Sequence, residues 1–363
     1  MQLLDSPQSS ISTSVLDSLQ DIANNIQIKS DFCISHPAYK PLDIPAEIIA
    51  RFQRTPLDLQ NKYLSIQLQS FLYGIYYNGS LRSELAKDAR STDLARHQNL
   101  ENNTFLGVDV EFYERLHKSN LGEGYFDPGW LLVRQESDGS LAVTKGGLTL
   151  HIERDRHLQP SERSASIGDL VAIRMPRNLV QNGFYMAVGD AGPDTSPQTV
   201  RVYFNLLPEG AVALMESLTQ HLNQIGIPFT FKVLYNPSDY GRYDSGVLYF
   251  EKSNYQAIWQ VLRNIYAEMQ SYFRTEVPLF TKFLAPGIAL AEEPDFKFAE
   301  SESFGMNRCQ IVANALLEAR QKGDESPQSR MEFIHQHFYL LGIDWQHSYL
   351  NANSEDIYTP LER

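Results

Sequence analysis

The sequence predicts an α+β fold in which helices flank a mostly antiparallel sheet, with a helical region at the N-terminus. Three observations lead to this prediction. Apolar residues recur at helical spacing near the N-terminus, short β-rich segments separated by turns follow, and helices alternate with strands after that. This order is typical of α+β proteins. We expect a helical region over 1–100, an α+β domain over 101–325 and a helical tail over 326–363.

Helices dominate the first of these regions. Residues 11–29 place apolar side chains at helical spacing, and the pattern returns at 46–52 and at 57–77 after a proline-containing connector. The last of these segments is rich in aromatic residues, and the sequence Asn78–Ser80 gives it a C-terminal stop signal. Residues 82–98 are polar and charged, which predicts exposed helix or loop.

Strand-like segments begin near Asn120 and are separated by glycine-containing turns. Amphipathic helices then alternate with further strands. We expect strands at 130–135, 141–145, 148–153, 169–175, 184–188, 199–206 and within 229–252, and helices at 209–225, 255–273, 299–322 and after residue 330.

Composition limits the classes of partner. The chain has 363 residues, a net charge of −13 and a pI near 5.2. Such acidity disfavours nonspecific binding to nucleic acid or to anionic membranes, so we expect neither as a partner. The two cysteines, Cys33 and Cys309, lie far apart and predict no disulfide framework. We find no signal peptide and no apolar run of ~18 residues, so we expect a cytoplasmic protein.

Motifs for common cofactors are missing from the sequence. It contains no G-x-G-x-x-G or G-x-x-x-x-G-K-[ST] phosphate loop, no H-E-x-x-H zinc motif and no G-x-S-x-G serine motif. His335 and His337 are two positions apart and so do not share a helix face. We therefore expect neither a metal nor a cofactor. His151, on a β-rich segment, is a candidate general acid; a structural or exposed histidine is the alternative.

The main candidate site lies in the segment 229–252. It reads as two strands joined by a turn-rich loop, and the alternation of apolar residues places Lys232 on the face opposite the phenylalanines. The loop supplies Tyr240 and Arg242. A strand lysine beside a loop arginine fits an anion site, because a guanidinium fork matches phosphate oxygens.

A second polar strand precedes this segment. Arg201, Tyr203 and Asn205 share one of its faces, and this face converges with that of Lys232 if the two strands are neighbours. From 201 to 282, seven basic residues balance seven acidic ones, so this block is neutral within an acidic chain. An anion pocket is one interpretation. A solvated sheet face with scattered ion pairs, and chance composition, are the alternatives.

Four ordered blocks of the sequence resemble the HopA-type effector family, whose members include secreted effectors of plant pathogens and stand-alone bacterial proteins. The similarity covers about residues 65–320. The blocks are Phe71–Ser80 (FLYGIYYNGS), Val200–Leu206 (VRVYFNL), Pro228–Phe250 (PFTFKVLYNPSDYGRYDSGVLYF) and Phe298–Leu317 (FAESESFGMNRCQIVANALL).

The resemblance implies an activity. Family members encoded beside peptide-modifying enzymes are similar to phosphoserine/phosphothreonine lyases, which leave dehydroalanine or dehydrobutyrine in a phosphorylated precursor peptide during lanthipeptide-like maturation. A more distant similarity is to the SpvC/OspF phosphothreonine lyases. Because the chain lacks kinase signatures, a separate kinase would have to supply the substrate. The family's secreted effectors leave secretion open.

The resemblance also implies roles for individual residues. Lys232 would be the base, Arg201 and Arg242 would clamp the phosphate, and Tyr203, Tyr240 or His151 would protonate or orient the leaving group. The K-F-H-type triplet of the lyases is absent, because Arg201-Val202-Tyr203 stands in its place. Further candidates for substrate binding, with structural roles as the alternative, are Asn205, Asn307, Arg308 and Arg174.

Two other functions remain open. The chain is a non-catalytic effector or binding module of the HopA type, or it is a peptide-recognition subunit that uses an exposed strand edge.

Overall fold

The computed structural model describes the chain except for residues 1–6, 31–32, 44–48, 51–53, 88–106 and 362–363. Within the described residues, the largest sheet has seven strands in the order β13-β14-β10-β12-β11-β9-β8, and all neighbouring strands are antiparallel. The α+β class with a mostly antiparallel sheet is confirmed. The strands are β8 (Asn178–Gln181), β9 (Phe184–Val188), β10 (Thr199–Phe204), β11 (Thr230–Leu234), β12 (Gly246–Glu251), β13 (Lys282–Ala285) and β14 (Ile288–Glu292).

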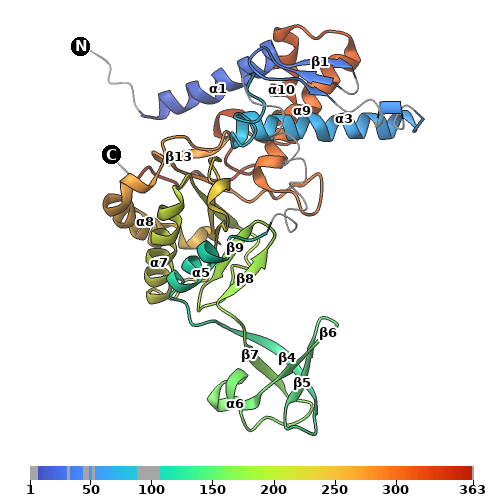
Figure 1. Ribbon diagram of the computed structural model, residues 1–363. Coiled ribbons are helices and arrows are strands. Elements are labelled where there is room, and N and C mark those ends of the chain that lie inside the picture. The colour runs from blue at the N-terminus through green and yellow to red at the C-terminus, as the bar shows by residue number, and fades with distance from the viewer. Residues whose placement is uncertain (1–6, 31–32, 44–48, 51–53, 88–106, 362–363) are drawn as a thin grey trace.

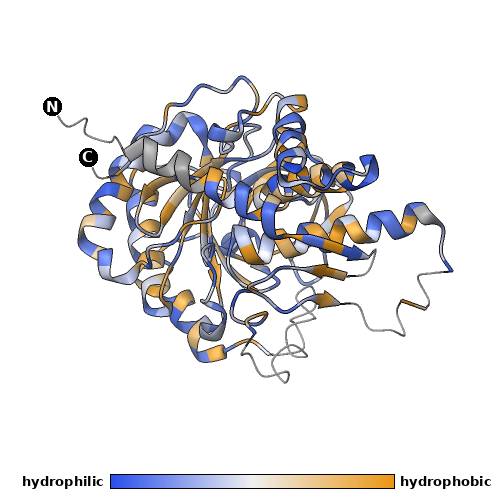
Figure 2. Cartoon of the chain, turned by 90° about the horizontal axis from the view of Figure 1, so that it is seen from above, coloured by the Kyte–Doolittle hydropathy of each residue, from blue (hydrophilic) through white to orange (hydrophobic). Residues whose placement is uncertain are grey.

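Two helices, α7 (Pro208–Gln224) and α8 (Tyr255–Met269), lie beside this sheet (Figure 1). Their buried apolar side chains belong to one hydrophobic core with Phe231 and Val233 of β11, which are fully buried. Hydrophobic residues follow the central strands, whereas hydrophilic residues mark the outer helices (Figure 2). The face that carries Phe231 is therefore the core face, and Lys232 points to the other one.

Helices from both ends of the chain pack together on the other side of the molecule (Figure 1). The N-terminal helices α1 (Pro7–Asn25) and α3 (Leu57–Leu72) contact α10 (Pro327–Leu340) and α9 (Phe304–Lys322) respectively, and α9 also contacts α10. A short π-helix, η1 (Tyr73–Tyr77), continues α3 and contacts α9. The helical N-terminal region is thus confirmed.

A second unit projects from the seven-stranded sheet (Figure 1). It is a four-stranded antiparallel sheet in the order β6-β5-β4-β7, and its buried residues, including Trp130 and Leu132, form a hydrophobic cluster of their own. The helix α5 (Val110–Ser119) precedes it. The unit consists of β4 (Phe126–Gln135), β5 (Leu141–Lys145), β6 (Leu148–Ile152), α6 (Arg154–His157) and β7 (Leu170–Arg174).

The structure differs from the predicted elements near the N-terminus. The helix expected over 11–29 ends at Asn25, and residues 26–29 alternate between buried and exposed, which is the period of a strand. They contribute to a small antiparallel sheet that the sequence analysis missed. Its strands are β1 (Gln27–Ser30), β2 (Cys33–Ser35) and β3 (Leu42–Asp43).

Further differences occur, among them β8 and α5, which were not predicted. The strands β13 and β14 were not predicted, because β14 (IALAE) is buried along its whole length and contains two alanines, which have low β propensity. The helix expected from residue 299 begins at Phe304, where the Ser303 side chain accepts a hydrogen bond from Met306 N as an N-cap. The helix expected at 46–52 and the segment 88–98 lie largely or wholly outside the described residues.

No helix within the described ranges is long and apolar enough to cross a membrane.

Candidate functional site

The antiparallel register brings the two predicted polar strands onto one face of the sheet. In β10 and β12, Arg201 lies opposite Tyr249. In the next row, Tyr203 lies opposite Val247, and Val247 lies opposite Lys232 of β11. Because opposite residues of antiparallel strands share a face, Arg201, Tyr203 and Lys232 all project from the same side of the sheet. The two predicted strands are not neighbours, because β12 lies between β10 and β11, but the register still places these three side chains on a common face.

Lys232 is surrounded by rings rather than by carboxylates. Its ammonium group lies 4.7 Å from the ring centroid of Phe184 and 5.3 Å from that of Tyr249. Its Nζ atom donates a hydrogen bond of 3.3 Å to Gln181 Oε1. No carboxylate of a described residue forms an ion pair with it. Lys232 is therefore a partly accessible cation whose positive charge is not neutralised by a carboxylate among the described residues.

Arg201 forms an ion pair with Glu293, and its guanidinium lies 5.1 Å from the centroid of the Tyr249 ring. Glu293 also accepts a hydrogen bond of 2.5 Å from Lys297 Nζ. Burial opposes ionisation of Glu293, but the neighbouring Arg201 and Lys297 outweigh this effect and hold its pKa below the ordinary value. Arg201 is thus held in place by a carboxylate that stays charged.

Arg242 comes from the loop between β11 and β12 and is held by Asp244. Its Nε and Nη2 atoms donate to the two Asp244 carboxylate oxygens at 2.5 and 2.8 Å. Tyr73 Oη donates to the same carboxylate at 3.2 Å. Asp244 is 5% exposed, and although burial favours its neutral form, Arg242 lowers its pKa below the ordinary value. The guanidinium also lies 6.0 Å from the Phe184 ring centroid.

The three predicted cations and two aromatic rings therefore form one continuous group. Along it, Arg201, Tyr249, Lys232, Phe184 and Arg242 alternate as cation, ring, cation, ring and cation. We call these five residues the cation–ring row. An aromatic face carries partial negative charge, so each ring offsets part of the repulsion between the cations on either side of it. The row suits a multiply charged anion.

Tyrosine hydroxyls border the row where the π-helix meets the sheet. The Tyr203 hydroxyl is buried and accepts or donates no hydrogen bond within the described part of the chain. The Tyr77 ring meets the Tyr203 ring edge-on at 6.3 Å and stacks on Tyr73 at 4.9 Å. Burial raises the pKa of Tyr203, so this hydroxyl keeps its proton. A buried hydroxyl without a partner is uncommon, and the proton of this one is not committed to another group among the described residues.

Both rings of the row, Phe184 and Tyr249, were not predicted from the sequence, nor were Tyr73, Tyr77, Asp244 and Glu293. One signal was present for Tyr73, because the aromatic block Phe71–Ser80 contains it and a π-helix often marks a functional site. No local pattern indicated Glu293, which the sequence places 92 positions from Arg201.

Three predicted residues lie away from the cation–ring row. Tyr240 is buried beside Phe112, and its hydroxyl donates to the Leu234 carbonyl at 2.6 Å. His151 is exposed on β6 of the four-stranded unit, 3.6 Å from Glu136. Arg174, at the end of β7, donates to the Glu123 carbonyl.

The other predicted binding residues hold backbone groups. Asn205 is buried just after β10 and donates to the Glu276 carbonyl at 2.9 Å. Asn307 accepts a hydrogen bond from Arg308, which is itself fully buried. Arg308 also donates to the carbonyls of Ser348 and Leu350 at 2.7 and 3.0 Å. Burial lowers the pKa of Arg308 to about 10. These contacts attach the C-terminal segment to α9.

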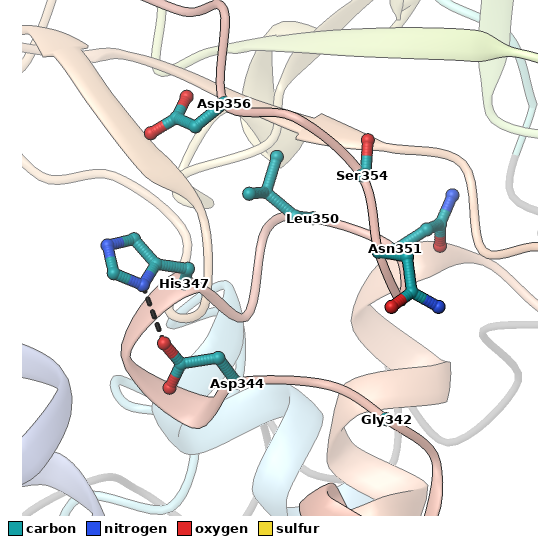
Figure 3. A pocket seen from close by; sticks show the side chains of 8 residues that line it. Gly342, Asp344, His347, Leu350, Asn351, Ser354 and Asp356 are labelled. Atoms are coloured by element: carbon teal, nitrogen blue, oxygen red, sulfur yellow. Dashed lines mark hydrogen bonds and ion pairs between the residues drawn. The ribbon is translucent and has the colours of Figure 1, made fainter.

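Two surface hollows lie outside the cation–ring row. The first has a volume of about 280 Å³ and lies in the C-terminal segment, where Asp344 and His347 are joined by a 2.7 Å contact (Figure 3). The second, of about 330 Å³, is lined by Arg82, Tyr243 and the loop 275–281. Tyr243, which lines the second hollow, stands between Arg242 and Asp244 in the chain. Among the described residues, no cluster of histidine, cysteine and carboxylate groups is arranged to hold a metal ion.

One family of known proteins matches part of the chain. Residues 175–350 match the model of the HopA1 effector protein family, which confirms the resemblance seen in the sequence. This region contains the whole cation–ring row and the helix α9. The segment 175–350 is thus a HopA1-family domain.

Two solved structures are similar to the chain, both of effector proteins from Pseudomonas syringae. One, from pathovar tomato strain DC3000, is 17% identical with a TM-score of 0.41, and the match covers 67% of this chain and 81% of the effector chain. The other, from pathovar syringae strain 61, is 14% identical with a TM-score of 0.44, covering 94% of this chain and 99% of its own. No curated protein matches the chain.

Proposed function

We propose that the protein is a phosphoserine/phosphothreonine lyase that eliminates phosphate from a phosphorylated precursor peptide and leaves a dehydroamino acid. We place this step in the cytoplasm, in ribosomal peptide maturation of the lanthipeptide type, with a separate kinase supplying the substrate. One observation carries the proposal: Lys232 has no carboxylate partner within the described residues and stands between two arginines on one sheet face.

We assign each step of the elimination to one residue. Lys232, once it has given its own proton to solvent, takes the Cα proton as a neutral amine, the electrons of that bond form the Cα=Cβ double bond, and the Cβ–O bond breaks. Phosphate leaves with the bonding electrons, and the guanidinium groups of Arg201 and Arg242 stabilise the charge that develops on it. We assign donation of a hydrogen bond to the leaving oxygen to Tyr203, whose hydroxyl is buried and protonated and has no hydrogen-bond partner among the described residues.

The arginines are arranged for this role. Arg201 uses Nε for Glu293, and Arg242 uses Nε and Nη2 for Asp244, so each guanidinium keeps a terminal nitrogen for phosphate. The carboxylates fix the orientation of both side chains before substrate arrives. Preorganised donors of this kind contribute to catalysis because they need no rearrangement in the transition state.

Mass spectrometry of a phosphothreonine peptide incubated with the protein tests the proposal. Loss of ~98 Da indicates elimination of phosphoric acid, whereas loss of ~80 Da indicates hydrolysis. We expect Lys232→Ala to abolish elimination and to bind the peptide almost as well as the wild type. Lys118→Ala, a change at an exposed lysine of α5, is the matched control and should keep full activity. Turnover by Lys232→Ala would remove Lys232 from the mechanism.

A phosphopeptide-binding module without catalysis is the second candidate. The contacts of the Lys232 ammonium group with two rings favour it, because a charged ammonium group can bind an anion without giving up a proton. It predicts binding of the phosphopeptide with no change of mass over prolonged incubation.

A further inference from the structure

The residues that lie opposite Lys232 on successive strands extend from it to the edge of the sheet. Lys232 lies opposite Met186 of β9, and Met186 lies opposite Leu179 of β8. All three side chains therefore share the face of the cation–ring row. Met186 is half-buried, and Leu179 is 40% exposed. β8 is the last strand of the sheet, so these opposed residues reach an edge of the sheet.

Phe184 widens this apolar surface. It lies in the neighbouring row, opposite Gln181, and its half-buried ring is under the ammonium group of Lys232. Leu179, Met186 and Phe184 thus form an apolar strip between Lys232 and the sheet edge. The opposite face of β11 is filled by the core residues Phe231 and Val233, but these three side chains keep access to solvent.

The distances across the strands from Lys232 to Met186 and Leu179 fit the spacing of side chains in an extended peptide. Neighbouring strands are about 4.8 Å apart, so Met186 and Leu179 stand roughly 5 and 10 Å from Lys232 across the sheet. In an extended chain, side chains on one face repeat about every 6.6 Å, that is, every second residue. If one residue of a bound peptide lies at Lys232, the peptide residue two positions away therefore lies over the apolar strip, between Met186 and Leu179.

We propose that the strip selects peptides with an apolar side chain two positions from the phosphorylated residue. The inference rests on the proposed function, which brings the phosphorylated residue to Lys232. The occupant is the substrate's own chain: its phosphate pairs with Arg201 and Arg242, and its apolar neighbour covers Leu179 and Met186, neither of which carries a charge. The strip acts on binding and contributes no catalytic group.

The test compares two phosphothreonine peptides. They are identical except at the positions two residues before and two residues after the phosphothreonine, which are both leucine in one peptide and both serine in the other. We expect kcat/KM for the leucine peptide to exceed that for the serine peptide by about tenfold, mostly through KM. Leu179→Glu should remove this preference. Leu170→Glu, at a leucine that is 68% exposed on the four-stranded unit, is the control and should keep it.

Two outcomes separate this inference from the proposed function. The proposed role of the strip is rejected if the wild type has equal kcat/KM for the two peptides, or if Leu179→Glu keeps the preference for leucine. Either result leaves the proposed lyase activity in place. Absence of elimination from both peptides overturns the lyase. The strip is then decided by fluorescence anisotropy of the same labelled peptides: weaker binding of the serine peptide supports it, and equal binding rejects it.

Discussion

The ammonium group of Lys232 lies over the ring of Tyr249, 5.3 Å from its centroid. The guanidinium of Arg201 lies 5.1 Å from the same centroid. One aromatic ring thus serves two cations that would otherwise repel each other, and neither contact is available to a residue without a π-face. This sharing explains how an acidic protein holds Arg201 and Lys232 on one sheet face although, among the described residues, only Arg201 has a carboxylate partner.

Replacing Tyr249 by leucine should weaken anion binding. The change removes both cation–π contacts, each worth about 0.5–1 kcal/mol at a partly exposed site, and leaves Arg201 and Lys232 less well held. We expect titration calorimetry with inorganic phosphate to show affinity lower by about five- to tenfold. Tyr249→Phe keeps the ring face and should bind as the wild type does. Equal affinity in all three proteins would contradict the role assigned to the ring.

Removing Asp244 should destabilise the fold. Asp244 is 5% exposed and holds Arg242 through two hydrogen bonds, so Asp244→Ala leaves a largely buried guanidinium without its counter-ion. Breaking a buried pair in this way costs about 3 kcal/mol of unfolding free energy. Urea denaturation measures the loss. Glu136→Ala, which breaks the exposed pair with Arg134, is the control and should cost less than about 1 kcal/mol.

Two tyrosines allow a direct comparison of a free and a bonded hydroxyl. Tyr203→Phe removes a buried hydroxyl with no partner among the described residues, so its unfolding free energy should stay equal or rise. Tyr240→Phe removes a hydroxyl that donates to the Leu234 carbonyl, and should cost about 1.5 kcal/mol. If Tyr203 assists the leaving group, its variant also loses at least about tenfold in kcat. A Tyr203→Phe protein that is stable and fully active would assign that step elsewhere.

Much of the candidate site followed from alternation along two strands. The period of two placed Lys232, Arg201 and Tyr203 correctly, because side-chain direction in a strand is a local property. Asn205 failed the same pattern for a local reason: β10 ends at Phe204, and its amide turns to the Glu276 carbonyl instead. Alternation reaches only as far as the strand does.

The groups that complete the site depend on tertiary contacts. Glu293 reaches Arg201 because β14 pairs with β10, and β14 was missed because a fully buried strand shows no alternation. Gly305 gives a second example: a Cβ atom there would overlap the Tyr77 ring, so the close approach of α9 to the π-helix requires glycine. Neither relationship leaves a periodic signal in the sequence.

Stability should fall in acid, and Glu292 should account for part of the loss. Its buried carboxylate accepts hydrogen bonds from Lys252, Ser354 and Tyr358, and these bonds attach the C-terminal segment to β14. Burial alone would raise its pKa, but the hydrogen bonds outweigh burial and hold the pKa below the ordinary value of 4.5. A depressed pKa in the folded state means that the charged carboxylate stabilises the fold above pH 4.5, and that this stabilisation disappears as the pH falls through the lower, folded value.

Glu292→Gln isolates this contribution. The variant should lose about 2 kcal/mol of unfolding free energy at about pH 7, because hydrogen bonds to a charged acceptor are replaced by weaker ones. Below about pH 5 its stability should decline less steeply than that of the wild type, so the two curves converge in acid. Urea denaturation at a series of pH values gives both curves. Glu114→Gln, at an exposed glutamate of α5, should leave the wild-type curve unchanged. Parallel curves for wild type and Glu292→Gln would show that Glu292 has no part in the acid transition.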